Sequence, residues 1–406
     1  MDDKLYEQEL LTCVRCGVCK STCPVFNHSG LEPDSPRGRM RLLWALYNGH
    51  IKYTETLYKR IFACVLCGDC TRHCNPGIDL NEVFYHARAL LSRHNKKTGI
   101  YSFLSNIAFR NADFFINISK PFSGLVIKPI QQFIKKKIHS KGLIPMNLDI
   151  SSKPFNNVKI FQPKEKIGRV ALFLGCSAKH LYPGYITALS SILTAINYEV
   201  VISPAEICCG APFRTLGLDS QAKAGARQNY ETFKNLNVDA VLSLCPTCVD
   251  SLNKYPLLIG DSICDVFDAN EFIYERFMRD HSLIKQVLPI KAVYHEPCHM
   301  VDKSSYDLAI LKKIVSEVIV PKMRKCCGFG GTFSLLNIEL SNNILTESCV
   351  ELNIANANAV VTSCPGCVFQ LSKQINDKPV YHIIELMEKA LFQDVKTSQD
   401  ATIIKE

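Results

Sequence analysis

Short apolar runs rich in β-branched residues alternate with amphipathic stretches through the second half of the 406-residue chain. Such runs are typical of buried strands, and six of them precede cysteines. The predicted strands are 170–174, 198–202, 240–244, 292–294, 315–320 and 359–362. Helical stretches such as 186–196 and 221–236 lie between them. This alternation predicts α/β units with parallel strands.

The six strands form an internal repeat. The sequence DAVLSLCPTC at 239–248 parallels NAVVTSCPGC at 358–367. Cys298, Cys326 and Cys364 follow their counterparts in the first repeat by 122, 118 and 119 residues. Ligands of open parallel sheets gather at the carboxyl ends of the strands, which is where these cysteines fall.

The N-terminal part of the chain reads as helical. Ser35 can cap a helix whose first position is Pro36, and the apolar residues that follow recur at helical spacing. A second helix is predicted over 80–93, with Asp79 or Asn81 as its cap.

Composition indicates a globular chain, with 47% hydrophobic and 21% charged residues. The first ten residues, MDDKLYEQEL, are acidic and contain no apolar stretch, so no export signal is expected. Twenty cysteines are then expected to be reduced thiolates in the cytoplasm rather than disulfides. The apolar stretch 181–198 contains Pro183, Gly184 and Asn197, which favours a buried helix over a membrane span.

Positive charge is concentrated in the segment 93–141, which has ten basic residues and one acid, Asp113, and holds the formal excess of +9. Aromatic and aliphatic side chains lie among the cations, as in an amphipathic segment on an anionic membrane surface. Docking to a partner or a plain basic linker would use the same residues. No nucleic-acid motif accompanies the charge.

Two cysteine runs have the spacing C-x2-C-x2-C-x3-C, which is typical of proteins with two [4Fe–4S] clusters. In such proteins the fourth cysteine of each run serves the other cluster, and zinc in paired C-x2-C sites fits the third cysteine poorly. One predicted ligand set is Cys13, Cys16, Cys19 and Cys74, and the other is Cys64, Cys67, Cys70 and Cys23.

Each repeat supplies five further cysteines. The first set is Cys176, Cys208, Cys209, Cys245 and Cys248, and the second is Cys298, Cys326, Cys327, Cys364 and Cys367. Five thiolates exceed the four that one cube or one zinc ion uses, which favours an iron–sulfur site of unusual shape. Structural zinc and redox-active thiols are the alternatives.

Several residues near these groups have two interpretations. Cys264 and Cys349 lie outside the pattern and are expected to be buried as small hydrophobic residues. His295 and His299 flank Cys298 and would either tune a cluster or support the structure. Arg37 and Arg39 would offset cluster charge or form the solvated face of a helix.

The expected fold is therefore an α/β multidomain protein: a helical ferredoxin domain with two [4Fe–4S] motifs, then two repeated Cys-Cys-Gly domains with parallel sheets. The expected boundaries are 1–93 for the ferredoxin domain, 94–165 for the basic segment and linker, 166–289 and 290–395 for the two Cys-Cys-Gly domains, and 396–406 for a tail.

Two ferredoxin motifs followed by two Cys-Cys-Gly domains resemble the glycolate oxidase iron–sulfur subunit, the C-type subunit of anaerobic glycerol-3-phosphate dehydrogenase and the D-type heterodisulfide reductase proteins. The resemblance runs from Cys13 to Cys367. The stretch 36–39, PRGR, is most similar to the glycolate oxidase type, whereas both complete sets of five cysteines are similar to the heterodisulfide reductase pattern.

The resemblance implies an electron-transfer subunit of a flavin-dependent dehydrogenase. A partner FAD subunit would oxidise glycolate, lactate or glycerol 3-phosphate, and electrons would pass through two [4Fe–4S] clusters and one or two Cys-Cys-Gly clusters toward membrane quinone. The alternative is a catalytic subunit that reduces a disulfide at a Cys-Cys-Gly cluster. No G-x-G-x-x-G follows a strand, so no flavin of its own is expected. Localisation in the cytoplasm, peripheral at the inner face of the membrane, is the matching expectation.

Overall fold

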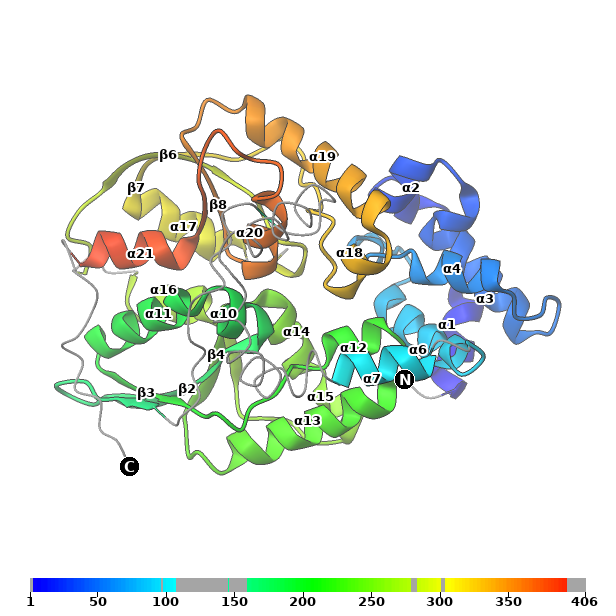
Figure 1. Ribbon diagram of the computed structural model, residues 1–406, viewed down its shortest axis with the longest axis horizontal. Coiled ribbons are helices and arrows are strands. Elements are labelled where there is room, and N and C mark those ends of the chain that lie inside the picture. The colour runs from blue at the N-terminus through cyan, green and yellow to red at the C-terminus, as the bar shows by residue number, and fades with distance from the viewer. Residues whose placement is uncertain are drawn as a thin grey trace, which may run out of the picture. The chain divides into compact units, whose positions relative to one another are not determined.

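The computed structural model describes residues 3–95, 98–106, 145, 159–278, 283–300 and 304–392. The chain divides into two compact units (Figure 1). The first unit comprises 1–112, 210–224 and 325–348, and the second comprises 113–209, 225–324 and 349–406. Each unit therefore draws on three separate stretches of the chain.

Helices build the first unit. They are α1 (Asp3–Thr12), η1 (Val18–Lys20), α2 (Pro24–Ser29), η2 (Glu32–Asp34), α3 (Pro36–Tyr47), α4 (Glu55–Phe62), α5 (Asp69–Arg72), α6 (Leu80–Ser92), α7 (Thr98–Ser105), α12 (Ala211–Thr215) and α18 (Thr332–Leu336). Helices α13 (Asp219–Lys234) and α19 (Ile338–Ile354) have residues in both units. The core of this unit includes Tyr6, Leu43, Ile61 and Phe84.

Both predicted helices of the N-terminal part form. The Ser35 hydroxyl accepts a hydrogen bond from the Gly38 amide at 2.9 Å and caps α3, whose first residue is Pro36. Asp79, rather than Asn81, caps α6, because its carboxylate accepts bonds from the amides of Asn81 and Glu82.

The second unit contains two sheets that share a four-stranded parallel order, and the first sheet has one additional strand, β1. The first sheet has the order β1-β3-β2-β4-β5, with β1 (Lys159–Phe161), β2 (Gly168–Phe173), β3 (Tyr198–Ile202), β4 (Ala240–Ser243) and β5 (Val266–Asp268). The second has the order β7-β6-β8-β9, with β6 (Leu288–Tyr294), β7 (Val315–Ile319), β8 (Ala359–Thr362) and β9 (Val380–His382). All neighbouring strands are parallel except β1 and β3.

This result confirms the predicted fold class. All six predicted strands form, whereas β1, β5 and β9 were not anticipated because each has only three residues. Four helices lie between the two sheets: α11 (Pro183–Ala195), α16 (Ala269–Arg276), α17 (Ser304–Ile314) and α21 (Ile383–Leu391) (Figure 1). Their apolar faces and both sheets share one core.

The remaining helices of the second unit lie near the cysteines. They are α10 (Gly175–Leu181), α14 (Pro246–Asn253), α15 (Tyr255–Ile259), η5 (Cys298–Met300) and α20 (Pro365–Leu371). Among the described residues, no helix has the length and apolar character needed to cross a membrane. Most of the basic segment, from 107 to 141, lies outside the described residues, so its membrane role stays a prediction.

Candidate iron–sulfur sites

The two ferredoxin-type runs follow the same backbone path. In the first, Arg15 and Gly17 have φ of 59° and 85°, and in the second, Leu66 and Gly68 have φ of 58° and 79°. A left-handed conformation at a residue with a side chain costs about 1–2 kcal/mol. Its recurrence at the same place in both runs indicates a loop shaped to turn three cysteines inward.

The first ferredoxin site is a cavity of about 350 Å³, part of which is open to solvent. Its cysteines are Cys13, Cys16, Cys19 and Cys74. Cys16 is exposed and the other three are partly buried. Desolvation raises the pKa of the Cys19 thiol to about 11, and the three other thiols of this site add to the shift.

The second ferredoxin site is a cavity of about 280 Å³, part of which is also open to solvent. Its cysteines are Cys23, Cys64, Cys67 and Cys70, and all four are buried. Burial raises the pKa of Cys23 to about 11 and raises the pKa of Cys70 well above its usual value. Thiols this hard to ionise need a cation to hold them as thiolates, which a metal cluster supplies.

The structure thus brings together the same two sets of four cysteines that the shared fourth-ligand rule predicts. Cys23 leaves its own run and joins the second, while Cys74 joins the first. The two sites are neighbours, because Cys19 of the first site adds to the pKa shift of Cys70 in the second. Four thiol sulfurs around a cavity suit the donor chemistry of a [4Fe–4S] cube.

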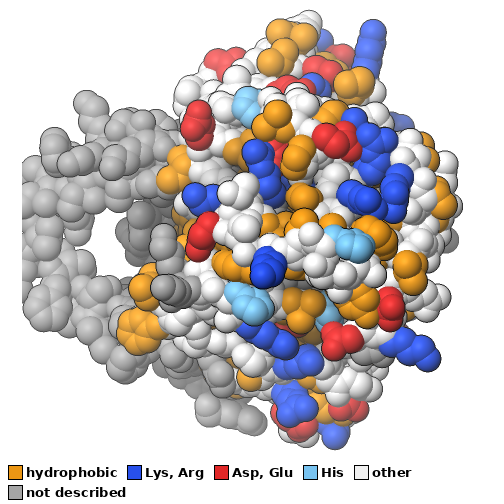
Figure 2. Space-filling view, turned by 90° about the vertical axis from the view of Figure 1, so that its right-hand side faces the viewer, with side chains coloured by type: hydrophobic (Ala, Val, Ile, Leu, Met, Phe, Trp, Pro, Cys, Tyr) orange, Lys and Arg blue, Asp and Glu red, His pale blue; other side chains and the backbone are white. Residues whose placement is uncertain are grey.

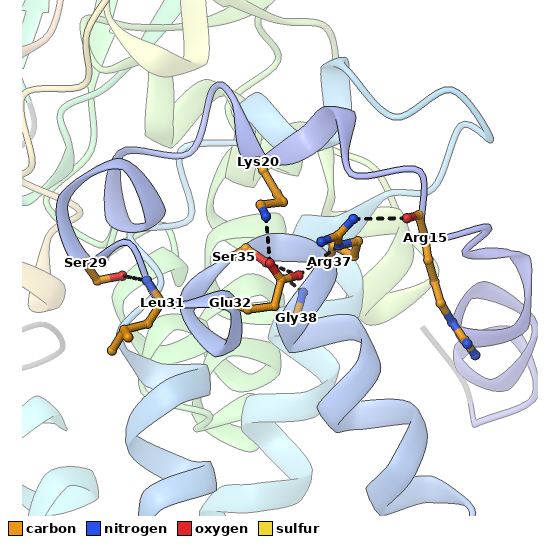
Figure 3. Close-up of polar contacts among 8 residues, drawn as sticks. All are labelled: Arg15, Lys20, Ser29, Leu31, Glu32, Ser35, Arg37 and Gly38. Carbon is orange, nitrogen blue, oxygen red and sulfur yellow. Dashed lines mark hydrogen bonds and ion pairs between the residues drawn. The ribbon is translucent and has the colours of Figure 1, made fainter.

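Charged side chains brace the first site (Figure 3). The Glu32 carboxylate accepts bonds from Arg37 Nε at 2.8 Å and Lys20 Nζ at 2.7 Å. Arg37 Nη1 also reaches the carbonyl oxygen of Arg15 at 3.4 Å, and the Arg37 amide donates to the Cys19 sulfur. These bonds tie the first cysteine loop to the start of α3.

Arginines near the second site are buried instead. Arg39 and Arg88 are both 0% exposed. The Arg88 guanidinium donates to the carbonyl oxygens of Cys64 at 2.6 Å and Thr215 at 2.9 Å. Arg39 therefore does not belong to a solvated helix face, which was one of its two interpretations.

The five cysteines of the first repeat converge within the second unit. The thiol of Cys208 hydrogen-bonds with Cys176 and Cys209, and these bonds, together with burial, raise its pKa. Cys248 bonds in turn with Cys209 and Cys245.

Neighbouring residues position the cysteines of the first repeat. The Cys209 carbonyl accepts bonds from Ser251 Oγ at 2.8 Å and the Tyr255 hydroxyl at 3.3 Å. Gly175 has φ of 66°, and a Cβ there would lie 2.9 Å from the Cys248 sulfur, so the approach of Cys248 requires glycine.

The second repeat is divided between the units. Cys298, Cys364 and Cys367 belong to the second unit, whereas Cys326 and Cys327 belong to the first. The grouping of all five thiols therefore stays a prediction. Within the second unit, Cys364 hydrogen-bonds with Cys245 of the first repeat, which brings the two predicted ligand sets into contact.

Among the remaining residues, Cys349 is buried as expected, but Cys264 is exposed, so the expectation of a buried small hydrophobe is wrong for it. Cys264 follows α15 and precedes the short strand β5, where it joins no core. His295 is buried, and desolvation lowers its pKa to about 4. His299 lies 3.8 Å from the Asp250 carboxylate.

The stretches after both Cys-Cys-Gly motifs pack in the first unit, which sequence reasoning missed. After Cys209, Arg214 forms two hydrogen bonds with the Glu82 carboxylate, at 2.9 and 2.6 Å. After Cys327, a Cβ on Gly330 would lie 2.8 Å from Val65, which stands between two cysteines of the second site. Gly330 therefore allows close contact with the second ferredoxin loop.

Comparison with known families matches two models. The family described as 4Fe-4S dicluster domain matches residues 9–78. The family described as Cysteine-rich domain matches 170–253 and 292–372, which are the two sheet-containing repeats. The predicted iron–sulfur chemistry and the internal repeat are thereby confirmed.

Two relatives span nearly the whole chain. The "Probable glycolate oxidase iron-sulfur subunit" of Bacillus subtilis is 25% identical over 402 residues, covering 91% of this chain and 90% of its own. A subunit of the "Anaerobic glycerol-3-phosphate dehydrogenase" of Escherichia coli K12 is 26% identical over 417 residues, covering 96% and 100%. A crystal structure of a hypothetical protein from Helicobacter pylori has a TM-score of 0.53 at 11% identity and covers 97% of this chain and 74% of that one; it shows the fold alone.

Proposed function

We propose that this chain, which is similar to the iron–sulfur subunits of glycolate oxidase and anaerobic glycerol-3-phosphate dehydrogenase, relays electrons for a flavin-dependent dehydrogenase. Its partner subunit would hold FAD and oxidise a hydroxy acid such as glycolate or lactate, or glycerol 3-phosphate. The electrons would pass through this chain toward membrane quinone.

The observation that carries this proposal is the pair of neighbouring cysteine cavities, one lined by exposed and partly buried cysteines and the other by buried cysteines. Two clusters at these places would give electrons a short path inward. Val65 of the second site touches Gly330, three residues after Cys327, which supports a next step toward the Cys-Cys-Gly cysteines.

We propose the eighteen patterned cysteines as ligands. Two [4Fe–4S] clusters would occupy the first and second ferredoxin sites. The converging thiols of Cys176, Cys208, Cys209, Cys245 and Cys248 support one further cluster, and the second repeat would supply another. FAD would belong to the partner, because the relatives are named as subunits of dehydrogenases and oxidases.

Contact with the membrane surface would use the basic segment. Its described part includes α7, on which Ile100, Phe103 and Leu104 are 61%, 66% and 53% exposed. Figure 2 shows hydrophobic side chains exposed among Lys and Arg on one face of the molecule. Apolar residues beside cations suit reversible attachment to anionic lipid, where each basic residue contributes on the order of 1 kcal/mol.

Anaerobic purification of the full chain tests the relay. We expect about eight iron and eight sulfide ions or more per chain, from two cubes and any further cluster. The chemically reduced protein should then pass electrons to a soluble quinone. Zinc with little iron, or iron that quinone does not reoxidise, would contradict the relay.

A second function is favoured by the contact between Cys245 and Cys364. Clusters on the two repeats would lie beside one another and could deliver two electrons which, with two protons from solvent, convert a disulfide into two thiols. Adding a small disulfide to the reduced protein separates the two functions, because a relay alone leaves the disulfide intact.

A further inference from the structure

Arg39 is a buried cation without an anionic partner in the described structure. Its side chain is 0% exposed on α3. Its Nε atom donates a hydrogen bond to the carbonyl oxygen of Arg60 at 2.8 Å. Its Nη1 and Nη2 atoms are buried and have no hydrogen-bond partner among the described residues.

The other buried arginines of the first unit have partners at both terminal nitrogen atoms. Arg214 is paired with the Glu82 carboxylate, and Arg88 donates to four backbone carbonyl oxygens. Burying a charge without a partner costs several kcal/mol, so a guanidinium that keeps two nitrogen atoms unpaired in a core is a position built for an anion.

The surroundings of Arg39 identify that anion. Pro36, one turn before Arg39 on α3, lines the second ferredoxin site, and the Arg39 charge opposes the rise in the pKa of the Cys23 thiol there. The Arg39 charge also acts on the Arg88 guanidinium, which itself bonds the Cys64 carbonyl oxygen. Two buried guanidinium groups that influence the same site are unfavourable unless negative charge offsets them.

A cluster at this place would supply that charge. Four thiolates and a [4Fe–4S]2+ core sum to two negative charges, and uptake of one electron makes three. A fixed cation nearby stabilises the reduced form more than the oxidised form, so it raises the reduction potential. The step adds one electron from an external donor to the core, and no bond or proton changes.

We propose that Arg39 is the counter-ion of the cluster bound by Cys23, Cys64, Cys67 and Cys70, and that it raises the potential of this cluster so that electrons collect there. The inference rests on the proposed cluster at the second site. The first site has no equivalent among the described residues, because the Arg37 side chain is 31% exposed and its charge is matched by Glu32 at 2.8 Å.

The test uses the full chain with its clusters, in wild type, three arginine variants and one cysteine variant that assigns the signals. R39M removes the charge and keeps an apolar side chain of similar length, while R39K keeps the charge. R41M removes an exposed cation from the same helix and is the matched control. Iron and sulfide are measured first, and the clusters are then titrated with dithionite and followed by electron paramagnetic resonance. The second-site signal is the one absent from C67S, because Cys67 belongs to the second run and lines the second site.

In R39M we expect the second-site potential to move to a more negative value, with the first-site signal unchanged. R39K and R41M should titrate close to wild type. An R39M potential that equals wild type, or that moves no more than that of R41M, overturns the inference while leaving the relay intact. Wild type that binds no iron overturns the relay and this inference together.

If R39M prevents the second-site cluster from forming, the iron content of the variants provides a second measurement. R39M that lacks four irons and the second-site signal, beside R39K that retains both, supports the need for a cation. Loss of the same cluster from R39K shows that shape rather than charge is required, and it overturns the inference.

Discussion

The two ferredoxin sites have the same cysteine spacing and the same left-handed residues, yet they differ in burial and charge. In the first site, Cys16 is exposed and the neighbouring Val14 is 69% exposed. In the second, all four cysteines are buried, and two buried arginines lie near them. The spacing of the cysteines therefore determines the backbone conformation of each loop, while the surrounding elements determine the burial and the charge around its cysteines.

The difference arises from what covers each loop. Asn81 of α6 and Pro36 of α3 line the second site, and Gly330 packs against its Val65. The ion pairs over the first site, from Glu32 to Arg37 and Lys20, are exposed. An exposed site suits electron entry from a partner, whereas a buried site with fixed cations suits holding an electron.

Exchange of the fourth ligands gives the largest expected effect. C23S should lose the second-site cluster, about four irons, and keep the first, because Cys23 lines the second cavity. C74S should do the reverse, since Cys74 lines the first cavity. Iron content and electron paramagnetic resonance report which signal is lost. Loss of the first cluster from C23S would show that each run serves its own cluster.

Gly38 lies where α3 packs closely against η2. A Cβ on Gly38 would lie 1.9 Å from the Glu32 carbonyl oxygen, which is too close for any side chain. G38A should push η2 away from α3 and destabilise the protein by about 3 kcal/mol. The melting temperature by circular dichroism measures this. G99A is the control, because a Cβ there meets nothing within 4 Å, and an unchanged melting temperature in both variants would refute the packing at Gly38.

The difference in burial should also make the two clusters lose iron to a chelator at different rates. A water-soluble iron chelator reaches the exposed first site directly, but it reaches the second only when the structure opens locally. We expect the first-site signal to decay several-fold faster in anaerobic protein treated with chelator. Equal decay, or faster loss of the second signal, would show that burial does not protect this site.

Local spacing explains what the sequence predicted. The C-x2-C-x2-C-x3-C runs specify a loop by themselves, and the repeated strand–cysteine pattern specifies two parallel sheets. The short strands β1, β5 and β9 escaped prediction, because three residues carry too little periodicity.

Long-range packing explains what the sequence did not predict. The placement of residues 210–224 and 325–348 in the first unit depends on distant contacts such as Arg214 with Glu82 and Gly330 with Val65. Helical spacing alone allowed Arg39 to face solvent, since only tertiary structure shows that α4 supplies its carbonyl acceptor, Arg60.

The smallest effect concerns the ion pairs over the first site. Arg37 and Lys20 hydrogen-bond the Glu32 carboxylate and lower its pKa to about 2, below the unfolded value of about 4.3. Because the folded value is the lower one, this stabilisation is complete above about pH 4.5 and is lost as the pH falls toward 2.

Glu32 is 44% exposed, so its contribution to the free energy of unfolding should stay under about 1 kcal/mol. E32Q should therefore melt slightly below wild type at pH 7, and this difference in melting temperature should narrow as the pH falls to 3 or in high salt. E165Q, which removes an exposed carboxylate elsewhere, should show no such pH dependence. A difference that persists unchanged at pH 3 would mean that Glu32 acts through packing rather than charge.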